Sequence, residues 1–313
     1  MAPLFDFGGT GGIHPCCGSM RILENRLTAD TAKASRKWDA IVTPSQGWFD
    51  FNLLETWRAR DLIFMLVKRD FVSVYKQTIL GPLWFVIQPV ATAMVFMLLF
   101  GIIARLPTGG IPPFLFYLSG LVMWNFFATS FLKTSDIFAG NAAIFGKVYF
   151  PRLTVPISSL ISTLMTFVIQ FLLFLAVTLS FGYLKDPLII AKAALLTIPL
   201  VFYTAMLGLG IGLCVSSLTT RFRDLGNLHG FALQLWMYST PVIYPVSLLP
   251  MRWQIISLIN PMAAPVTAFR SLWLGTPSPD PMSWVFGLTF TGAMLLLGLS
   301  LFSHTQRLAM DTI

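Results

Sequence analysis

The sequence predicts an all-α integral membrane protein with six transmembrane helices, and two observations lead to this fold class. Of the 313 residues, 56% are hydrophobic and only 11% are charged, whereas soluble domains carry about 25% charged residues. In addition, eight of the thirteen acidic residues lie at or before Asp70. The remaining chain is therefore poor in carboxylates, and we interpret the net charge of +8 as a sign of membrane topology and not of nucleic-acid binding.

Residues 1–50 are predicted to form a flexible cytoplasmic lead-in. The first twenty are rich in Gly and Pro and lack the apolar core of a signal peptide, and Met20 is an alternative start. Cys16 and Cys17 are adjacent, which is unsuited to a disulfide, and a metal site would need further ligands at suitable spacing. We therefore expect no metal ligands in this chain.

An amphipathic helix is predicted over Trp57–Lys76, inside a segment that covers residues 51–80. Apolar residues recur at helical spacing on one side and polar residues occupy the other. The apolar side is Ile63, Val67, Phe71, Val74 and Tyr75, and the polar side is Arg58, Asp61, Arg69, Ser73 and Lys76. Such a helix lies in the membrane interface with its basic side chains toward lipid phosphates. A docking helix of a cytoplasmic domain is the alternative, but a membrane span follows almost immediately.

Six apolar segments follow within residues 81–305, and a cytoplasmic tail of residues 306–313 ends the chain. Each segment is close to or above the ~20 residues that cross ~30 Å of hydrocarbon. They are Leu83–Ala104, Pro113–Leu132, Val155–Phe181, Leu188–Leu218, Asn227–Leu248 and Met282–Ser303. The fourth is overlong and contains Pro199, so we expect a kink or an extension beyond the bilayer. It also carries a small-residue face at Ala205, Gly208, Gly210 and Gly212, which favours close helix packing inside the protomer.

Basic residues determine the orientation of the spans. With the N-terminus inside, sixteen of the twenty-one Lys and Arg residues fall in cytoplasmic segments. The five outer ones are Arg105, Lys185, Lys192, Arg252 and Arg270. Both termini are therefore expected to be cytoplasmic. Between spans five and six, Met251–Leu258 and Pro265–Leu274 are too short to cross and are interpreted as re-entrant or interfacial helices on the outer face, with a structured loop as the alternative.

Polar and aromatic residues at membrane depth indicate a transport pathway. The stretch from Phe231 to Pro245 places several of them in the fifth span, together with two prolines, and such groups are costly in hydrocarbon unless they are buried or face water. The residues predicted to line a channel are Trp84, Phe85 and Gln88 in the first span and Gln234, Trp236, Tyr238 and Tyr244 in the fifth. Aromatic faces stack on sugar rings, so a glycan is a plausible cargo on physical grounds.

Motifs for nucleotide hydrolysis and for catalysis are weak in this sequence. The segment Gly140–Lys147 has five residues between its glycines and Val148 in place of Ser or Thr, so it fails the P-loop pattern. We therefore expect no ATP hydrolysis by this chain. The spans contain no central carboxylate or histidine, which a proton-coupled carrier would need. A membrane enzyme would depend on Asp136 or Asp224 inside, or on Asp186 or Asp280 outside.

Two compact basic loops on the cytoplasmic side are suited to docking into a partner. One is Lys133–Leu153, which ends in KVYFPRL, and the other is Thr219–Gly226. Simple positive-inside anchoring is the alternative for both. The first loop is too apolar for an anchor alone, because Phe145, Val148, Tyr149 and Phe150 gather in it.

The order of several segments resembles a known family. The segments are VKRDFVSVYKQTILGPLWFVIQP (67–89), GLVMWNFFATS (120–130), GNAAIFGKVYFPRLTVP (140–156), TTRFRDL (219–225), QLWMYSTPVIYP (234–245) and INP (259–261). Together they resemble the ABC-2 type permeases that export lipid-linked polysaccharides, with the O-antigen and capsule exporters as the nearest members. The resemblance covers the chain from about Leu54 to the C-terminus.

The resemblance implies a homodimer in the cytoplasmic (inner) membrane, paired with two copies of an ATPase subunit that binds ATP and Mg. It also implies that the loop ending at Arg152 docks that ATPase as a coupling helix, so Lys147, Tyr149, Phe150 and Arg152 are the predicted coupling residues. Spans one and five would line the channel, and the helices between spans five and six would close it from outside. We further expect Arg69 and Lys76, with Lys147 and Arg152, to meet the pyrophosphate or lipid headgroup at the inner entrance.

The function expected from the sequence is thus the membrane subunit of an ABC exporter for a lipid-linked polysaccharide, O-antigen on polyprenyl pyrophosphate. A capsular polysaccharide or teichoic-acid exporter is the alternative within the family. From other classes, an ATP-independent channel or carrier and a membrane glycan-modifying enzyme remain as alternatives.

Overall fold

The computed structural model describes residues 53–76, 80–138, 140, 153–183, 186–222 and 224–311. Within these ranges the regular structure is helical, as the sequence predicts, and residues 47–313 form one compact unit. The helices before the second span are α2 (Leu53–Arg58), α3 (Arg60–Lys76), η1 (Gly81–Leu83), α4 (Trp84–Phe96) and the π-helix η2 (Met97–Ile103). Those that follow are α5 (Pro113–Ser135), α7 (Thr154–Ser180), α8 (Pro187–Arg221), α9 (Leu225–Ser239), η3 (Val246–Leu248), α10 (Met251–Ile259), α11 (Ala263–Leu274) and α12 (Pro281–Asp311).

Among the described residues, five helices are long and apolar enough to cross a membrane. They are Gly81–Ile103, Pro113–Ser135, Thr154–Ser180, Pro187–Arg221 and Pro281–Thr305, and they confirm the first four and the last of the predicted spans. α5, α8 and α12 each begin at a proline, which suits the first helical turn because its N–H groups have no partner inside the helix. A sixth candidate is the pair α10–α11, which is bent by 97°.

The predicted fifth span, Asn227–Leu248, is not a single helix. α9 ends at Ser239 after 15 residues, which is about 22 Å of helix and too short for the ~30 Å hydrocarbon core. The helix stops because Pro241 has no N–H to continue it and Thr240 turns into extended backbone, with its own N–H shared between the carbonyls of Trp236 and Met237. The chain then turns through residues 240–245 and returns as η3, α10 and α11.

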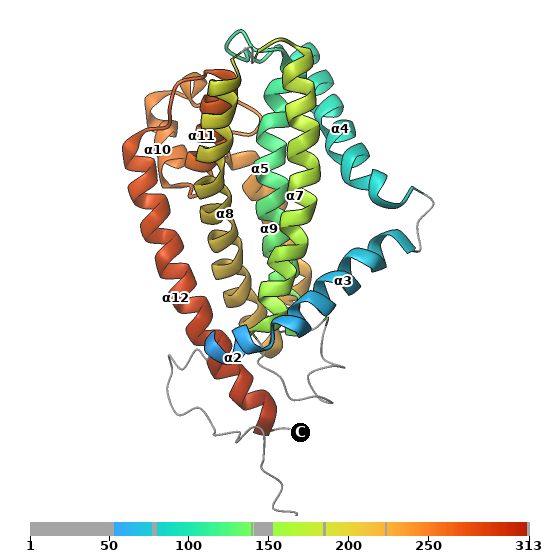
Figure 1. Ribbon diagram of the computed structural model, residues 1–313. Helices are drawn as coiled ribbons and strands as arrows, with labels where there is room; N and C mark the ends of the chain where they lie inside the picture. Colours follow the sequence, from blue (N-terminus) through green and yellow to red (C-terminus); the bar gives the residue numbers. More distant parts are fainter. Residues whose placement is uncertain are drawn as a thin grey trace, which may run out of the picture. The chain divides into compact units, whose positions relative to one another are not determined.

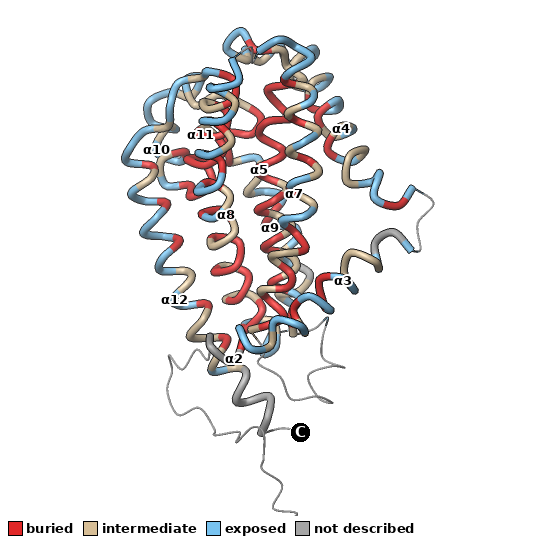
Figure 2. The backbone as a smooth tube through the Cα atoms, in the orientation of Figure 1, coloured by how far each residue is buried: buried red, intermediate tan, exposed pale blue. Residues whose placement is uncertain are grey.

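α5 is the most buried of the spans and lies at the centre of the packing (Figures 1 and 2). It packs against α7, α8, α11 and α4, while α8 also packs along α12. Glycines permit these close approaches: a Cβ at Gly212 would lie 2.5 Å from the Thr134 Cβ of α5, and one at Gly210 would lie 2.8 Å from the Leu295 N of α12. The small-residue face of the fourth span is therefore an internal packing surface, as predicted.

α8 is continuous over 35 residues, with Pro199 inside it. At 1.5 Å per residue it is about 52 Å long, so it extends beyond a hydrocarbon core of ~30 Å. The predicted short helices of the outer face are also present, as α10 and α11. The bundle has an α3 end, in the lower half of Figure 1, and an α10–α11 end, toward the top of the figure.

Candidate functional site

The first-span residues predicted to line a channel lie on α4, and two of the three face away from the rest of the chain. Trp84 is 46% exposed and Gln88 is also exposed, whereas Phe85 is half-buried. The Gln88 amide has no hydrogen-bond partner among the described residues. This surface of α4 therefore presents an unsatisfied amide within a membrane span, where lipid tails offer no partner.

The fifth-span residues lie on α9 and on the turn after it. Gln234 and Tyr238 are exposed, the latter by 47%, whereas Trp236 and Tyr244 are half-buried. α4 and α9 both pack against α5, but α4 otherwise contacts α7 and α9 contacts α8. The two predicted groups thus lie on different surfaces of the described part of the chain, and a shared channel between them would need a second chain.

The polar atoms of the α9 end are used inside the protein, where Asn260 organises them. Its side-chain oxygen accepts hydrogen bonds from Trp236 Nε1 and from Met262 N, both at 3.0 Å. Its amide donates to Thr240 Oγ1 at 3.0 Å and to the Ser239 carbonyl at 3.3 Å. Tyr244 donates to the same Ser239 carbonyl at 2.9 Å. These bonds join the end of α9 to the turn between α10 and α11.

Arg270 of α11 is the most deeply buried charged residue of this end, with 3% of its surface exposed. Its Nε donates to Ser119 Oγ at 3.3 Å, and its Nη1 donates to the Pro241 carbonyl at 3.1 Å. Nη2 donates to two carbonyls, those of Val242 at 3.2 Å and Phe116 at 3.4 Å. The guanidinium also lies 3.6 Å from the centre of the Phe116 ring, a cation–π contact. Arg270 therefore ties α11 to both α5 and the broken end of α9.

Arg270 is not among the site residues predicted from the sequence, where it is one of five basic residues expected on the outer face. Two signals point to its burial. It is the sole charge in the apolar helix AAPVTAFRSLWL, and Gly120 on α5 leaves the space that its guanidinium fills: a Cβ there would lie 2.9 Å from Nη2.

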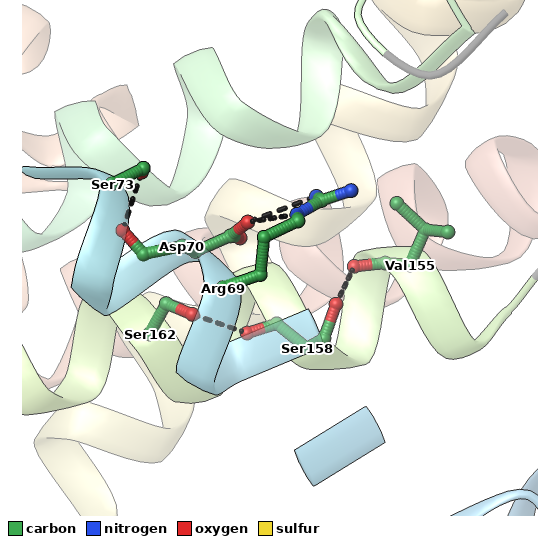
Figure 3. Close-up of polar contacts among 6 residues, drawn as sticks. All are labelled: Arg69, Asp70, Ser73, Val155, Ser158 and Ser162. Atoms are coloured by element: carbon green, nitrogen blue, oxygen red, sulfur yellow. Dashed lines mark hydrogen bonds and ion pairs between the residues drawn. The ribbon is translucent and has the colours of Figure 1, made fainter. Parts of the chain in front are cut away.

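At the α3 end, α3 packs along α7 (Figure 3). Ile63, Leu66 and Val67 of α3 are buried, and the first and last of them belong to the predicted apolar side. On α7, Ser158 and Ser162 donate to their own helix at 2.9 Å each, to the carbonyls of Val155 and Ser158. Their short side chains are thereby satisfied without a partner on α3, which allows the two helices to approach closely.

Arg69 and Lys76, predicted to meet a pyrophosphate or lipid headgroup, are both exposed on α3. Arg69 pairs with the neighbouring Asp70 at 2.9 Å (Figure 3). Where α5 ends and α9 begins, His229 Nε2 lies 3.7 Å from Asp136 Oδ1.

The predicted coupling residues Lys147, Tyr149, Phe150 and Arg152 lie outside the described residues. Within the described residues, no group of three or more His, Cys, Asp or Glu side chains is placed to hold a metal ion.

Comparison with known proteins finds one family match and several similar relatives. The family of ABC-2 type transporters matches over residues 61–274. An O-antigen export system permease protein RfbA of Klebsiella pneumoniae is 28% identical over 249 residues, which cover 79% of this chain and 92% of the relative. A protein of the same name from Myxococcus xanthus is 27% identical over 228 residues, which cover 72% of this chain and 85% of the relative.

Proposed function

The chain belongs to the family of ABC-2 type transporters, and we propose that it exports a lipid-linked polysaccharide, namely O-antigen carried on polyprenyl pyrophosphate. Membership makes it a transporter membrane subunit and not itself an enzyme, and it implies a partner ABC ATPase. The observation that supports this choice of cargo is the set of relatives named as O-antigen export permeases, which align over 72–79% of this chain.

We propose further that the working unit contains two copies of this chain and two copies of the ATPase, which bind ATP and Mg. It would lie in the cytoplasmic membrane with both termini in the cytoplasm. Two features support a second copy: Gln88 on α4 and Gln234 on α9 both expose an amide that has no hydrogen-bond partner among the described residues. A channel shared by two protomers would give these amides water or each other as partners.

In this proposal, ATP-driven closure of the ATPases reaches the spans through the loop that holds Lys147, Tyr149, Phe150 and Arg152. α7 begins directly after that loop and packs against both α3 and α5. A displacement of the loop would thus be passed to α5, on which α4, α9 and α11 are all packed.

The test has two readouts. Cells that lack the chain are expected to lose their surface polysaccharide and to accumulate lipid-linked glycan on the cytoplasmic side, and the wild-type chain should restore both. In mild detergent, a tagged chain should co-purify with a stoichiometric ATPase, and replacement of residues 149–152 by a polar linker should remove it. A chain that purifies alone, or a deletion that leaves surface polysaccharide unchanged, would refute the proposal.

A further inference from the structure

A cavity of about 610 Å³ lies at the α10–α11 end. It is lined by Phe116 of α5 and by four further segments: the loop that precedes α5, the stretch from Pro245 through α10, α11, and residues 275–283 before and at the start of α12. Its volume falls in the ~300–1,000 Å³ range of ligand sites in proteins. Unlike the chain's lipid-facing surfaces, it is lined by hydroxyl, amide and charged side chains from all four segments.

Several of these polar groups have hydrogen-bonding capacity that the protein does not use. Ser257 of α10 is only 4% exposed and lines the cavity, yet its hydroxyl has no partner among the described residues. The oxygen is not fully enclosed by protein atoms, so it can bond to a molecule inside the cavity. One turn away, Gln254 donates a single bond, to the Leu249 carbonyl at 3.0 Å, so its second N–H and its oxygen remain available.

The two charged groups of the cavity each bond to the protein and each keep hydrogen-bonding capacity. Arg270 has five N–H groups, and its four hydrogen bonds within the chain leave one N–H of Nη1 unused. Asp280 accepts a bond from the Met282 N–H at 2.9 Å, which leaves its other oxygen free. The cavity thus offers single positive and negative groups together with neutral donors and acceptors, and no cluster of one sign.

This arrangement fits a neutral ligand that carries many hydroxyl groups, because each hydroxyl both donates and accepts. An anion would meet the Asp280 carboxylate, and a cation would meet Arg270. We propose that this cavity binds a sugar unit of a glycan. The inference rests on the proposed function in that the sugar unit would belong to the exported chain, which would contact the bent pair α10–α11 as it leaves.

The test uses the transporter reconstituted with its ATPase in lipid nanodiscs and a panel of methyl glycosides of hexoses, 6-deoxyhexoses and N-acetylhexosamines. Saturation-transfer NMR measures their binding, with inorganic phosphate as the anionic probe. At least one glycoside is expected to bind. Ser257→Ala and Gln254→Ala should each weaken it about fivefold, the loss that corresponds to one hydrogen bond of ~1 kcal/mol.

Two further variants serve as controls. Ser257→Thr keeps the hydroxyl and should keep binding within a factor of about two. Ser180→Ala removes a hydroxyl at the end of α7 that is not part of the cavity and bonds to its own helix, and it should bind as the wild type does.

Absence of glycoside binding, equal binding by Ser257→Ala and the wild type, or binding of phosphate alone would each overturn the inference. These outcomes are separate from the proposed function. Loss of surface polysaccharide and co-purification of the ATPase are measured in cells and in detergent, without the glycoside panel, so either proposal can fail while the other stands.

Discussion

Arg270 is a buried cation whose partners are carbonyl and hydroxyl oxygens, and among the described residues it has no carboxylate within ion-pair distance. A buried charge is tolerated only when its hydrogen-bonding groups are satisfied. Here the planar fork of the guanidinium matches acceptors on two different elements, α5 and the turn after α9. A lysine cannot reproduce this because its single ammonium cannot reach four acceptors at once.

We expect Arg270→Met to destabilise the protein by about 2 kcal/mol or more, since it leaves the buried carbonyls of Pro241 and Val242 without donors at ~1–3 kcal/mol each. The Phe116 carbonyl keeps the hydrogen bond that Ser119 Oγ donates to it at 2.7 Å. Arg270→Lys should fall between this variant and the wild type. Thermal unfolding in nanodiscs measures the effect. The matched control is Arg252→Met, because Arg252 is exposed on the neighbouring α10. Equal melting temperatures for the two Met variants would show that the contacts of Arg270 with α5 and the turn after α9 do not stabilise the protein.

At the residue scale, sequence reasoning identifies polar groups but not their partners. Trp236 and Tyr244 were predicted to line a pathway because polar atoms at membrane depth require partners. The structure supplies those partners internally, on Asn260 and Ser239. Arg270 shows the same limit, because its acceptors on α5 lie 151 and 154 residues away in the chain. Such contacts leave only indirect traces in a sequence, such as Gly120.

At the element scale, the predicted spans and short outer helices follow from local hydropathy, which is why α4, α5, α7, α8, α10, α11 and α12 agree with the sequence. The end of α9 does not follow from hydropathy, because apolar residues resume at Val242 and Ile243 after the polar Ser239 and Thr240. Pro241 and Pro245 were visible as missing donors, but whether a proline kinks or ends a membrane helix depends on how the freed carbonyls are satisfied.

The joint between α9 and α11 depends on Asn260. Asn260→Leu is expected to raise hydrogen exchange across residues 236–262, because Trp236 Nε1, Thr240 Oγ1 and Met262 N lose a partner. Trp236→Phe removes only one of these bonds and keeps the ring that packs on Phe127, so its effect should be smaller. Unchanged exchange in Asn260→Leu, measured by mass spectrometry, would show that the joint is held by other contacts.

The packing of α8 gives a second prediction at this scale. Gly210→Ala should lower stability by about 1–3 kcal/mol, since its Cβ would lie 2.8 Å from the backbone N of Leu295, which cannot move aside as a side chain can. Gly230→Ala in α9 has nothing within 4 Å of the new methyl group, and it should raise stability by up to ~1 kcal/mol. Thermal unfolding of both variants would test whether Gly210→Ala melts at a lower temperature than Gly230→Ala. A higher melting temperature for Gly210→Ala would contradict the close packing of α8 on α12.

At the scale of the whole molecule, the surfaces of α4 and α9 are incomplete in a single chain. Both carry exposed aromatic residues, which a membrane protein tolerates in lipid, but also the amides of Gln88 and Gln234, which lipid cannot satisfy. The amides on these surfaces therefore require hydrogen-bond partners from water or from another chain in the assembled transporter. The channel-lining residues remain a prediction, because they depend on the proposed second copy of the chain.

Gln88→Leu and Gln234→Leu are expected to slow polysaccharide export roughly fivefold each, the loss of about one hydrogen bond, while melting temperatures stay equal or rise. Export is measured as the rate at which surface glycan appears after the chain is induced. Thr289→Leu on α12 is the control, because Thr289 is exposed and bonds to its own helix. Full export by both glutamine variants would place these amides outside the pathway.

The break after α9 also has a consequence for how the chain is inserted into the membrane during synthesis. Among the described residues, the carbonyls of Pro241 and Val242 obtain their side-chain donors only from Arg270, which is synthesised 29 and 28 residues later. Until then, α9 is a short helix with two unsatisfied carbonyls, a form that hydrocarbon does not accommodate. We therefore expect α9, α10 and α11 to enter the bilayer together, as one block that docks on the α5 already in place. A chain arrested before Arg270 has been synthesised should leave this part outside the lipid core.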